Sequence, residues 1–368
     1  MSAEKLKLDE VCYKGSSTLM QKSLPIGSGE YPVYGASGLI GEVDFYMQEN
    51  AYIGIVKDGA GVGRAMLLPA KSSCLGTIQY ILPKETIDIR YLFYAIENMR
   101  LSKYSTGATI PHIYFKDYKN ELIPNISLDE QQAVASKLDS IQRSIKRRQA
   151  QLALFDDLVK SQFIEMFGEL GKDIKGWGLR PLGDCCELNP RKSDDSRLAA
   201  GLEVTFVPMP AVSENGEMDS SCVKLYEQVQ TGFTYFAEND VLFAKITPCM
   251  ENGKGAVARG LKNGVGFGST EFHVLRPIAG VSNPVWLYVV TTFRKFRQDA
   301  AKKMTGSAGQ RRVPSSLLAS YTISLPPLEL QNAFARFVEQ TDKSKFRIKQ
   351  SLEKLEKCYK ALLQKYFG

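Results

Sequence analysis

The chain has 368 residues, 44% of them hydrophobic and 24% charged, which suits about two or three folded domains and excludes global disorder. No apolar run approaches the ~18 residues of a membrane span, and the N-terminus lacks an apolar signal core, so no membrane association and a cytoplasmic location are expected. The formal net charge of +7 lies in the second half: residues 1–168 carry 19 basic and 19 acidic residues, and residues 169–368 carry 28 and 21.

The first half begins with a strand-rich region. Residues 51–56 and 64–68 predict two strands joined by the glycine loop 58–63, and residues 77–83 predict a further strand that ends in proline. A helix is predicted at about 89–104. The glycine loop lacks a complete GxGxxG pattern and a following GKS or GKT, so a tight turn with positive φ is favoured over nucleotide binding.

A long helix is predicted next, over residues 128–168. Its apolar residues recur in alternating steps of four and three, which is typical of a coiled-coil seam. They are Val134, Leu138, Ile141, Ile145, Leu152, Phe155, Val159 and Met166.

The second half repeats this order of elements. Strands are predicted at 240–246, 256–258 and 271–277, with a loop at 251–255 and a helix at 285–300. A second long helix follows over 328–368, with its seam at Phe334, Val338, Ile348, Leu352, Leu355, Tyr359, Leu362 and Tyr366.

An internal repeat joins the two halves. A shift of 200 residues superimposes 128–168 on 328–368 without a gap, with ten identities in 41 positions. Arg148 interrupts the first seam where the second has Ile348, and Lys345 interrupts the second where the first has Ile145. Polar breaks that do not coincide favour pairing of the two helices within one chain. The alternative is that each helix covers only its own domain.

The predicted fold is therefore α+β, with two strand-rich domains that form a pseudo-repeat, separated by two long antiparallel coiled-coil helices. The predicted boundaries are 1–126 for the first domain, 127–168 for the central helix, 169–326 for the second domain and 327–368 for the C-terminal helix.

No catalytic or metal site is predicted. The seven cysteines form no CxxC pair and their number is odd, which disfavours both a disulfide framework and a zinc cluster. Local packing or hydrogen bonding is the favoured role of the two histidines, His112 and His273. The paired carboxylates at 156–157 and 194–195 are adjacent in sequence rather than spaced as an acid and a base, and the Pro-Pro at 326–327 is not followed by an aromatic residue.

Basic residues suggest a nucleic-acid surface. The stretch 294–312 is cationic and interleaved with glycine and serine, and its first-half counterpart 106–117 is less basic and more aromatic. Arginine and glutamine can read guanine and adenine edges, while main-chain N–H groups reach phosphates. Taken singly, each lysine is more simply explained as a solvated surface charge.

The pattern resembles the specificity (S) subunit of type I restriction–modification systems. Cys186-Glu-Leu-Asn-Pro-Arg-Lys192 resembles the opening of a target-recognition domain, and Asp240-Val-Leu-Phe-Ala-Lys-Ile-Thr-Pro-Cys249 resembles its central hairpin. Ser324-Leu-Pro-Pro-Leu-Glu-Leu-Gln331 is similar to the start of the family's conserved helices. The hairpin of the first half departs from the pattern, because it lacks the Thr-Pro-Cys element.

The resemblance implies a non-catalytic DNA-recognition subunit. Each domain would read one half of a bipartite target in double-stranded DNA, and the helices would set the spacing of the halves and dock two methyltransferase (M) subunits. Restriction/translocase (R) subunits would complete the complex. No cofactor is expected on this chain; S-adenosylmethionine, ATP and magnesium are expected on the partner subunits. The predicted DNA contacts are Lys57, Arg64, Tyr114, Lys116, Lys245, Asn252, Lys254, Gln310, Arg311 and Arg312.

Two other classes of protein remain as alternatives. A self-sufficient restriction enzyme is disfavoured because the sequence lacks nuclease and methyltransferase motifs. A coiled-coil scaffold that does not bind DNA is disfavoured by the basic glycine- and serine-containing loop.

Overall fold

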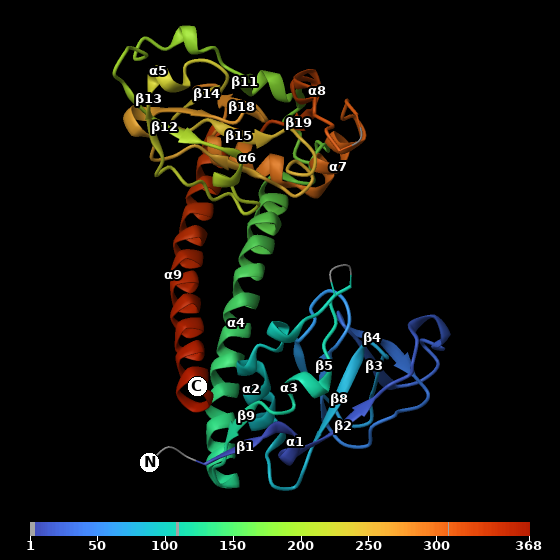
Figure 1. Cartoon of the computed structure of the whole chain (residues 1–368). Helices are drawn as coiled ribbons and strands as arrows, with labels where there is room; N and C mark the ends of the chain where they lie inside the picture. Colours follow the sequence, from blue (N-terminus) through green and yellow to red (C-terminus); the bar gives the residue numbers. More distant parts are fainter. Residues whose placement is uncertain (1–3, 108–109, 308) are drawn as a thin grey trace. The chain divides into compact units, whose positions relative to one another are not determined.

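A computed structural model describes residues 4–107, 110–307 and 309–368 (Figure 1). Residues 1–3, 108–109 and 308 lie outside the described residues. Residues 108–109 belong to the aromatic stretch 106–117, and residue 308 to the basic stretch 294–312, which were both named from the sequence. Internal contacts divide the chain into two compact units. The first unit is 1–150 with 348–368, and the second is 151–347. Each unit therefore holds one strand-rich domain and one end of each long helix.

The first domain contains two main sheets and a small one. A four-stranded sheet has the order β2-β8-β5-β6, a three-stranded sheet the order β4-β3-β7, and β1 pairs with β9. The strands are β1 (Lys5–Lys7), β2 (Cys12–Ser16), β3 (Tyr31–Gly35), β4 (Gly38–Val43), β5 (Tyr52–Val56), β6 (Ala65–Leu68), β7 (Ser73–Cys74), β8 (Ile78–Pro83) and β9 (Leu122–Pro124). The helices are α1 (Leu8–Val11), α2 (Ile89–Met99), α3 (Phe115–Tyr118) and α4 (Leu128–Phe167).

The second domain also has three sheets, the second of which contains one more strand than in the first domain. Its sheets have the orders β11-β18-β15-β16, β13-β12-β17-β14 and β10-β19. The strands are β10 (Leu179–Pro181), β11 (Cys186–Leu188), β12 (Glu203–Val207), β13 (Val223–Leu225), β14 (Thr234–Ala237), β15 (Val241–Ala244), β16 (Gly255–Val257), β17 (Val265–Gly268), β18 (Phe272–Pro277) and β19 (Thr322–Ser324). The helices are α5 (Tyr226–Val229), α6 (Pro284–Thr292), α7 (Arg294–Lys302), α8 (Ser315–Ser320) and α9 (Leu328–Phe367).

The central hairpins agree with the prediction. Strands β5, β6 and β8 and their counterparts β15, β16 and β18 fall within two residues of the predicted ranges. In the loop after β5, Gly59, Gly61 and Gly63 all have positive φ, and a Cβ at Gly63 would lie 2.4 Å from the backbone N of Ser102. The loop is thus a tight connection that requires glycine, as predicted.

Two predicted helices differ in detail. The helix predicted over 89–104 ends at Met99 and continues as a short 3-10 helix, because Arg100 adopts a left-handed conformation. The single helix predicted over 285–300 is wrong: α6 ends at Thr292, Phe293 is extended with a φ of −63° and a ψ of 133°, and α7 begins at Arg294. Phe293 packs against Phe163 of α4, which gives the break a packing partner.

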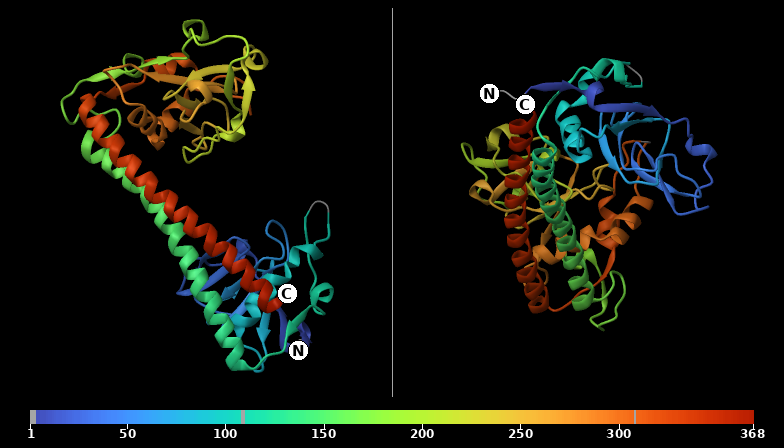
Figure 2. Two further views of the ribbon diagram at one scale, coloured as in Figure 1. Left: turned by 90° about the vertical axis from the view of Figure 1, so that its left-hand side faces the viewer. Right: turned by 90° about the horizontal axis from the view of Figure 1, so that it is seen from below.

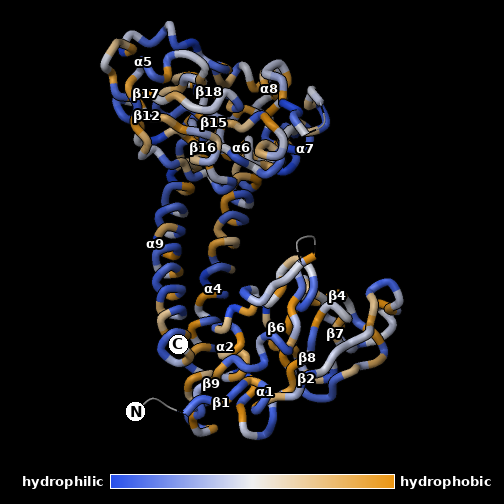
Figure 3. The backbone as a smooth tube through the Cα atoms, viewed as in Figure 1, coloured by the Kyte–Doolittle hydropathy of each residue, from blue (hydrophilic) through white to orange (hydrophobic). Residues whose placement is uncertain are grey.

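Both long helices begin where the sequence indicates. The N-terminus of α4 is capped by Ser127 and Glu130, whose side chains bond each other's backbone N–H at 3.4 and 3.0 Å. The N-terminus of α9 follows the two prolines at 326–327. Colour alternates between hydrophobic and hydrophilic along both helices, as expected where each buries one side (Figure 3).

In both units the two helices lie side by side (Figures 1 and 2). In the first unit, the start of α4 shares a core with the end of α9, through Val134 and Leu138 on one side and Leu363 and Phe367 on the other. In the second unit, the end of α4 contacts the start of α9, where the ring centroids of Phe163 and Phe334 are 5.6 Å apart. The antiparallel intramolecular pairing is therefore confirmed.

A polar interruption of the seam has a partner on the other helix. Lys345 is largely buried, and its Nζ lies 2.7 Å from Oδ1 of Asp156 on α4. A buried lysine without an anion would be costly, so this ion pair favours one register of the two helices. Among the described residues, no helix has both the length and the apolar character needed to cross a bilayer.

Candidate nucleic-acid interface

The end of strand β15 holds the loop 305–313 in the second domain. Val313 N donates to the carbonyl of Lys245 at 2.9 Å, and Thr247 N donates to the carbonyl of Arg311 at 3.0 Å. Within the loop, Thr305 and Arg312 exchange two backbone hydrogen bonds of 3.0 and 2.8 Å. These bonds bring Lys245, Gln310, Arg311 and Arg312, four of the predicted contacts, to one edge of the domain.

The arginines of this edge have partners within the chain. Nη2 of Arg312 lies 2.8 Å from Glu271 Oε1, and its Nε lies 3.0 Å from Oε2, so the pair is bidentate. The Arg312 guanidinium lowers the pKa of the Glu271 carboxyl. Arg311 donates through Nη2 to the carbonyl of Ala301, and Gln310 is exposed. The side chain of Arg312 is 42% exposed, so its guanidinium remains accessible to an anion.

His273 supports this edge from inside the domain. It is buried on β18, and its Nε2–H donates to the carbonyl of Val313 at 2.7 Å. A carbonyl can only accept, so Nδ1 is the acceptor and receives the Asn189 amide N–H at 3.2 Å. Burial lowers the pKa of His273, which therefore holds the loop as a neutral ring.

The first domain builds the same backbone frame. Ile113 N donates to the carbonyl of Lys57 at 3.0 Å, and Thr106 and His112 exchange backbone hydrogen bonds of 2.9 and 2.8 Å. Lys57 follows β5 as Lys245 follows β15, and His112 takes the place of Arg312. The two edges are thus equivalent in backbone.

The side chains of the first edge are aromatic. His112 pairs through Nδ1 with Asp58, and its ring packs against that of Tyr114 in a tilted contact, with centroids 4.1 Å apart. Tyr114 is half exposed, and the Nζ of Lys116 lies 5.2 Å from its ring centroid. Lys57, Tyr114 and Lys116 therefore gather at this edge, while Arg64 is exposed at the end of the glycine loop.

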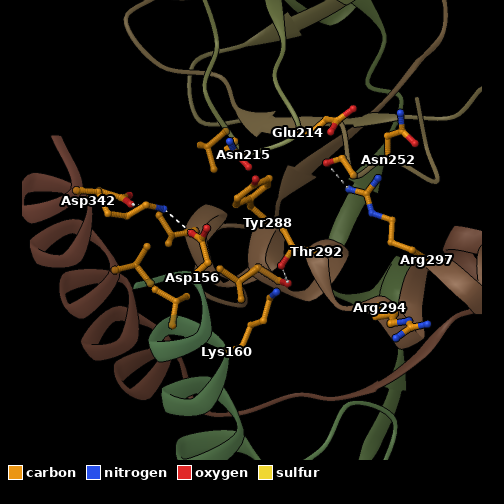
Figure 4. A pocket seen from close by; sticks show the side chains of 18 of the residues that line it. Asp156, Lys160, Glu214, Asn215, Asn252, Tyr288, Thr292, Arg294, Arg297 and Asp342 are labelled. Carbon is orange, nitrogen blue, oxygen red and sulfur yellow. Dashed lines mark hydrogen bonds and ion pairs between the residues drawn. The ribbon is translucent and has the colours of Figure 1, made fainter. Parts of the chain in front are cut away.

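The remaining two predicted contacts lie on the hairpin loop after β15. Lys254 is half-buried, with its Nζ 3.4 Å from the carbonyl of Met209. Asn252 is exposed and lines a cavity of about 590 Å³ within the second unit (Figure 4). The structure therefore places Asn252 in the lining of this cavity.

The cavity has a balanced charge. Its lining includes Lys160, Arg259, Arg294, Arg297 and Lys345, and also Asp156, Glu214, Glu251, Glu339 and Asp342. Arg297 is 6% exposed and donates to backbone carbonyls of the hairpin loop, at 2.7 Å to Met250 and 3.2 Å to Gly253. Burial lowers the pKa of Arg297 to about 10. Arg297 thus shapes the hairpin loop, and the mixed lining does not favour a polyanion.

The sequence reasoning missed the acidic partners of both edges. Asp58 was recognised only as the start of the glycine loop, and Glu271 only as the start of a strand. Their pairing with His112 and Arg312 depends on contacts between residues 41 or more positions apart, for which the sequence carries no local signal. Within the described ranges, no group of three His, Cys, Asp or Glu residues could hold a metal ion.

The amino-acid sequence matches a known protein family over most of its length. The family described as type I restriction modification DNA specificity domain matches residues 2–154 and 174–357. The specificity subunit of the type I restriction enzyme EcoAI from Escherichia coli is 40% identical over 159 residues, or 42% of this chain and 26% of that protein. The EcoEI specificity subunit, also from E. coli, is 33% identical over 225 residues, or 60% and 34%. The matched regions thus cover about a third or less of these relatives.

Solved structures share the fold. The S subunit of the type I restriction–modification system of M. genitalium has a TM-score of 0.60 at 15% identity, with 99% of this chain and 96% of that chain covered. A chain from work on complex assembly and conformational transition of the type I R–M system has a TM-score of 0.53 at 18% identity, covering 100% and 97%. At these identities the likeness concerns the fold alone.

Proposed function

Because the chain belongs to the family of type I restriction modification DNA specificity domains, we propose that it is the non-catalytic subunit that recognises DNA in such a complex. Residues 1–126 and 169–326 each read one half of a bipartite double-stranded target. The helices at 127–168 and 327–368 connect the two reading domains, so the accepted gap follows from their geometry.

The observation that carries this proposal is the duplicated edge. The same backbone frame presents Lys57 in one domain and Lys245 in the other, while the neighbouring side chains differ. A constant frame suits contacts with the uniform phosphate backbone, and variable side chains suit two different base sequences. The proposed contacts are Lys57, Arg64, Tyr114, Lys116, Lys245, Lys254, Gln310, Arg311 and Arg312; Asn252 is a weaker candidate because it lies in the charge-balanced cavity.

The long helices supply the surface for two methyltransferase subunits. Leu154 and Leu158 of α4 are 65% and 44% exposed, although they are large and apolar. They lie one turn apart on α4, so their side chains share one face of the helix. S-adenosylmethionine belongs to these partners; ATP and magnesium belong to the restriction subunits.

Methylation mapping tests the proposal. The chain is co-expressed with the methyltransferase subunit of its own system, and N6-methyladenine is located by sequencing the cellular DNA. We expect a split motif with a fixed gap that disappears without this chain. Replacing residues 169–326 by the corresponding domain of a relative changes one half of the motif only. Substituting Leu154→Asp with Leu158→Asp removes the methyltransferase from the purified complex.

Other outcomes favour the other classes of protein. Cleavage or methylation of DNA by the purified chain alone would indicate a self-sufficient enzyme. A folded chain that neither binds DNA nor directs methylation would indicate a scaffold.

A further inference from the structure

The repeat places a glutamine at the same position of both long helices, and both side chains are buried. Gln131 is 4% exposed and Gln331 is fully buried. Each lies in the first turn of its helix, where most polar side chains could reach water. Burial of an amide is tolerated only if its hydrogen bonds are made inside the protein.

Gln131 makes three backbone hydrogen bonds in the first unit, which join residues 86–88 to the start of α4. Its Oε1 accepts from the backbone N–H of Asp88 at 2.8 Å. Its Nε2 donates to the carbonyl of Ile126 at 2.9 Å and to that of Thr86 at 3.4 Å. Asp88 is the N-cap of α2, so one side chain ties the long helix α4, the turn before it and the start of the domain helix.

Gln331 makes the same three bonds in the second unit. Its Oε1 accepts from Asn283 N at 2.9 Å, and its Nε2 donates to Pro326 O at 2.8 Å and Val281 O at 3.0 Å. Asn283 is the N-cap of α6. Its own amide also donates to Oδ1 of Asn332, the next residue of α9, at 2.9 Å. The joint is therefore a duplicated device, which has kept its contacts although the surrounding residues differ.

The domain helices connect these joints to the reading edges. Helix α2 packs on β5 and β6, and α6 packs on β15, β16 and β18. Lys57 directly follows β5, and Lys245 directly follows β15. A change in the angle at a glutamine joint therefore moves the edge that it supports, because helix and hairpin form one packed body.

We propose that Gln131 and Gln331 are positioning residues that fix the orientation of each domain on its long helix and so set the gap between the two half-sites that the chain accepts. This inference rests on the proposed function. The two continuous helices transmit a fixed geometry only if each domain is held at one angle where it meets its helix. A buried amide with three bonds supplies that angle, whereas an apolar side chain of the same size would fill the space without directing it.

The experiment measures gap selectivity rather than affinity alone. The complex of chain and methyltransferase binds duplexes that carry both half-sites, taken from the methylation map, with the gap at its native length and at one base pair more or less. Gln331→Met preserves volume and removes all three bonds. We expect it to reduce the preference for the native gap by about tenfold, the effect of one or two hydrogen bonds, and the double substitution with Gln131→Met to reduce it further.

Matched variants separate orientation from stability. Leu318→Ala removes buried volume from α8 in the core of the same unit, away from the joint, and lowers the Tm while keeping the gap preference. Asn332→Ala removes only the accessory bond to Asn283 and relaxes the preference mildly, which provides a reading if Gln331→Met does not fold.

If the glutamine variants lost affinity equally at all gap lengths, they would keep the gap preference as Leu318→Ala does. That result would overturn the inference and leave the proposed function intact. A wild-type complex that shows no bipartite target would overturn both.

Discussion

The proposed reading edges of the two domains share a backbone and differ in chemistry. In the first domain, the loop is closed by His112 on Asp58, with Tyr114 packed beside it. In the second, Arg312 on Glu271 occupies the same place. In both, the residue after the central strand accepts a hydrogen bond from the end of the loop. The fold therefore fixes where a recognition loop lies, while a few side chains decide what it contacts.

Each loop is also closed by a carboxylate that pairs with the side chain at the matched position, Asp58 with His112 and Glu271 with Arg312. The acids come from different sites, since Asp58 follows β5 and Glu271 precedes β18. A free carboxylate at a proposed DNA-facing edge would repel the polyanion, so the bidentate pairing of Glu271 with Arg312 both orders the loop and reduces that repulsion. The fold does not dictate which strand end supplies the acid.

The largest effect is expected from removing the guanidinium of Arg312. An exposed ion pair contributes little to stability, whereas a lost base contact costs about 1–3 kcal/mol in binding. We expect Arg312→Ala to weaken target binding by that larger amount, because it also leaves Glu271 as an unpaired anion. Titration of labelled duplex by fluorescence anisotropy measures the loss.

Glu271→Gln is the control for that substitution. It frees the guanidinium of Arg312 without removing it, so the affinity for DNA stays within a few-fold of the original chain. Equal losses from Glu271→Gln and Arg312→Ala would mean that the arginine acts only by closing the loop. The matched change in the first domain, His112→Ala, tests whether its aromatic edge depends on the same closure.

A smaller and more symmetrical effect is expected at the two lysines. Lys57 and Lys245 occupy equivalent positions, so Lys57→Ala and Lys245→Ala should weaken binding of all DNA sequences by similar factors. For a phosphate contact, each substitution reduces the slope of log affinity against log salt by about 0.9. Lys172→Ala, at an exposed site away from both edges, provides the control. A loss confined to one target sequence would instead identify a base contact.

The sequence was informative where the pattern is periodic or duplicated. The seam from Val134 to Met166, and its copy from Phe334 to Tyr366, are buried or half-buried throughout, and the hairpins follow their glycine loops. By contrast, the sheets containing β3 and β12 were not anticipated. Each includes one parallel pair across a long connection, β3 with β7 and β12 with β17, which no local turn signal announces. The local hairpin of β3 with β4 was overlooked.

The candidate site was predictable as a region but not as a set of contacts. The basic stretch identified the loop 305–313, yet nothing in it revealed that Glu271 holds Arg312 or that Asn252 faces a cavity. The break between α6 and α7 at Phe293 was missed for a similar reason, since it depends on packing against Phe163 of α4, which is distant in sequence.

The smallest expected effect is a difference between the two domains in how their stability depends on pH. Burial lowers the pKa of His273 in the folded state, so the folded second domain resists protonation more than the unfolded chain does. Its stability is therefore complete above the ordinary histidine pKa of about 6.5 and falls as the pH decreases below it, by at most about 1.4 kcal/mol per pH unit for one group.

The first domain has Gln79 at the equivalent position of β8, which does not titrate. Hydrogen exchange of amides in β15 and β18 should therefore accelerate between pH 7 and 5 more than exchange in β5 and β8, after correction for the intrinsic rate. His273→Gln, which copies the first domain, should abolish the difference, because an amide gains no proton in this pH range. If the acceleration persisted in His273→Gln, other groups would control the acid response, and the neutral ring would not be what links the recognition loop to pH.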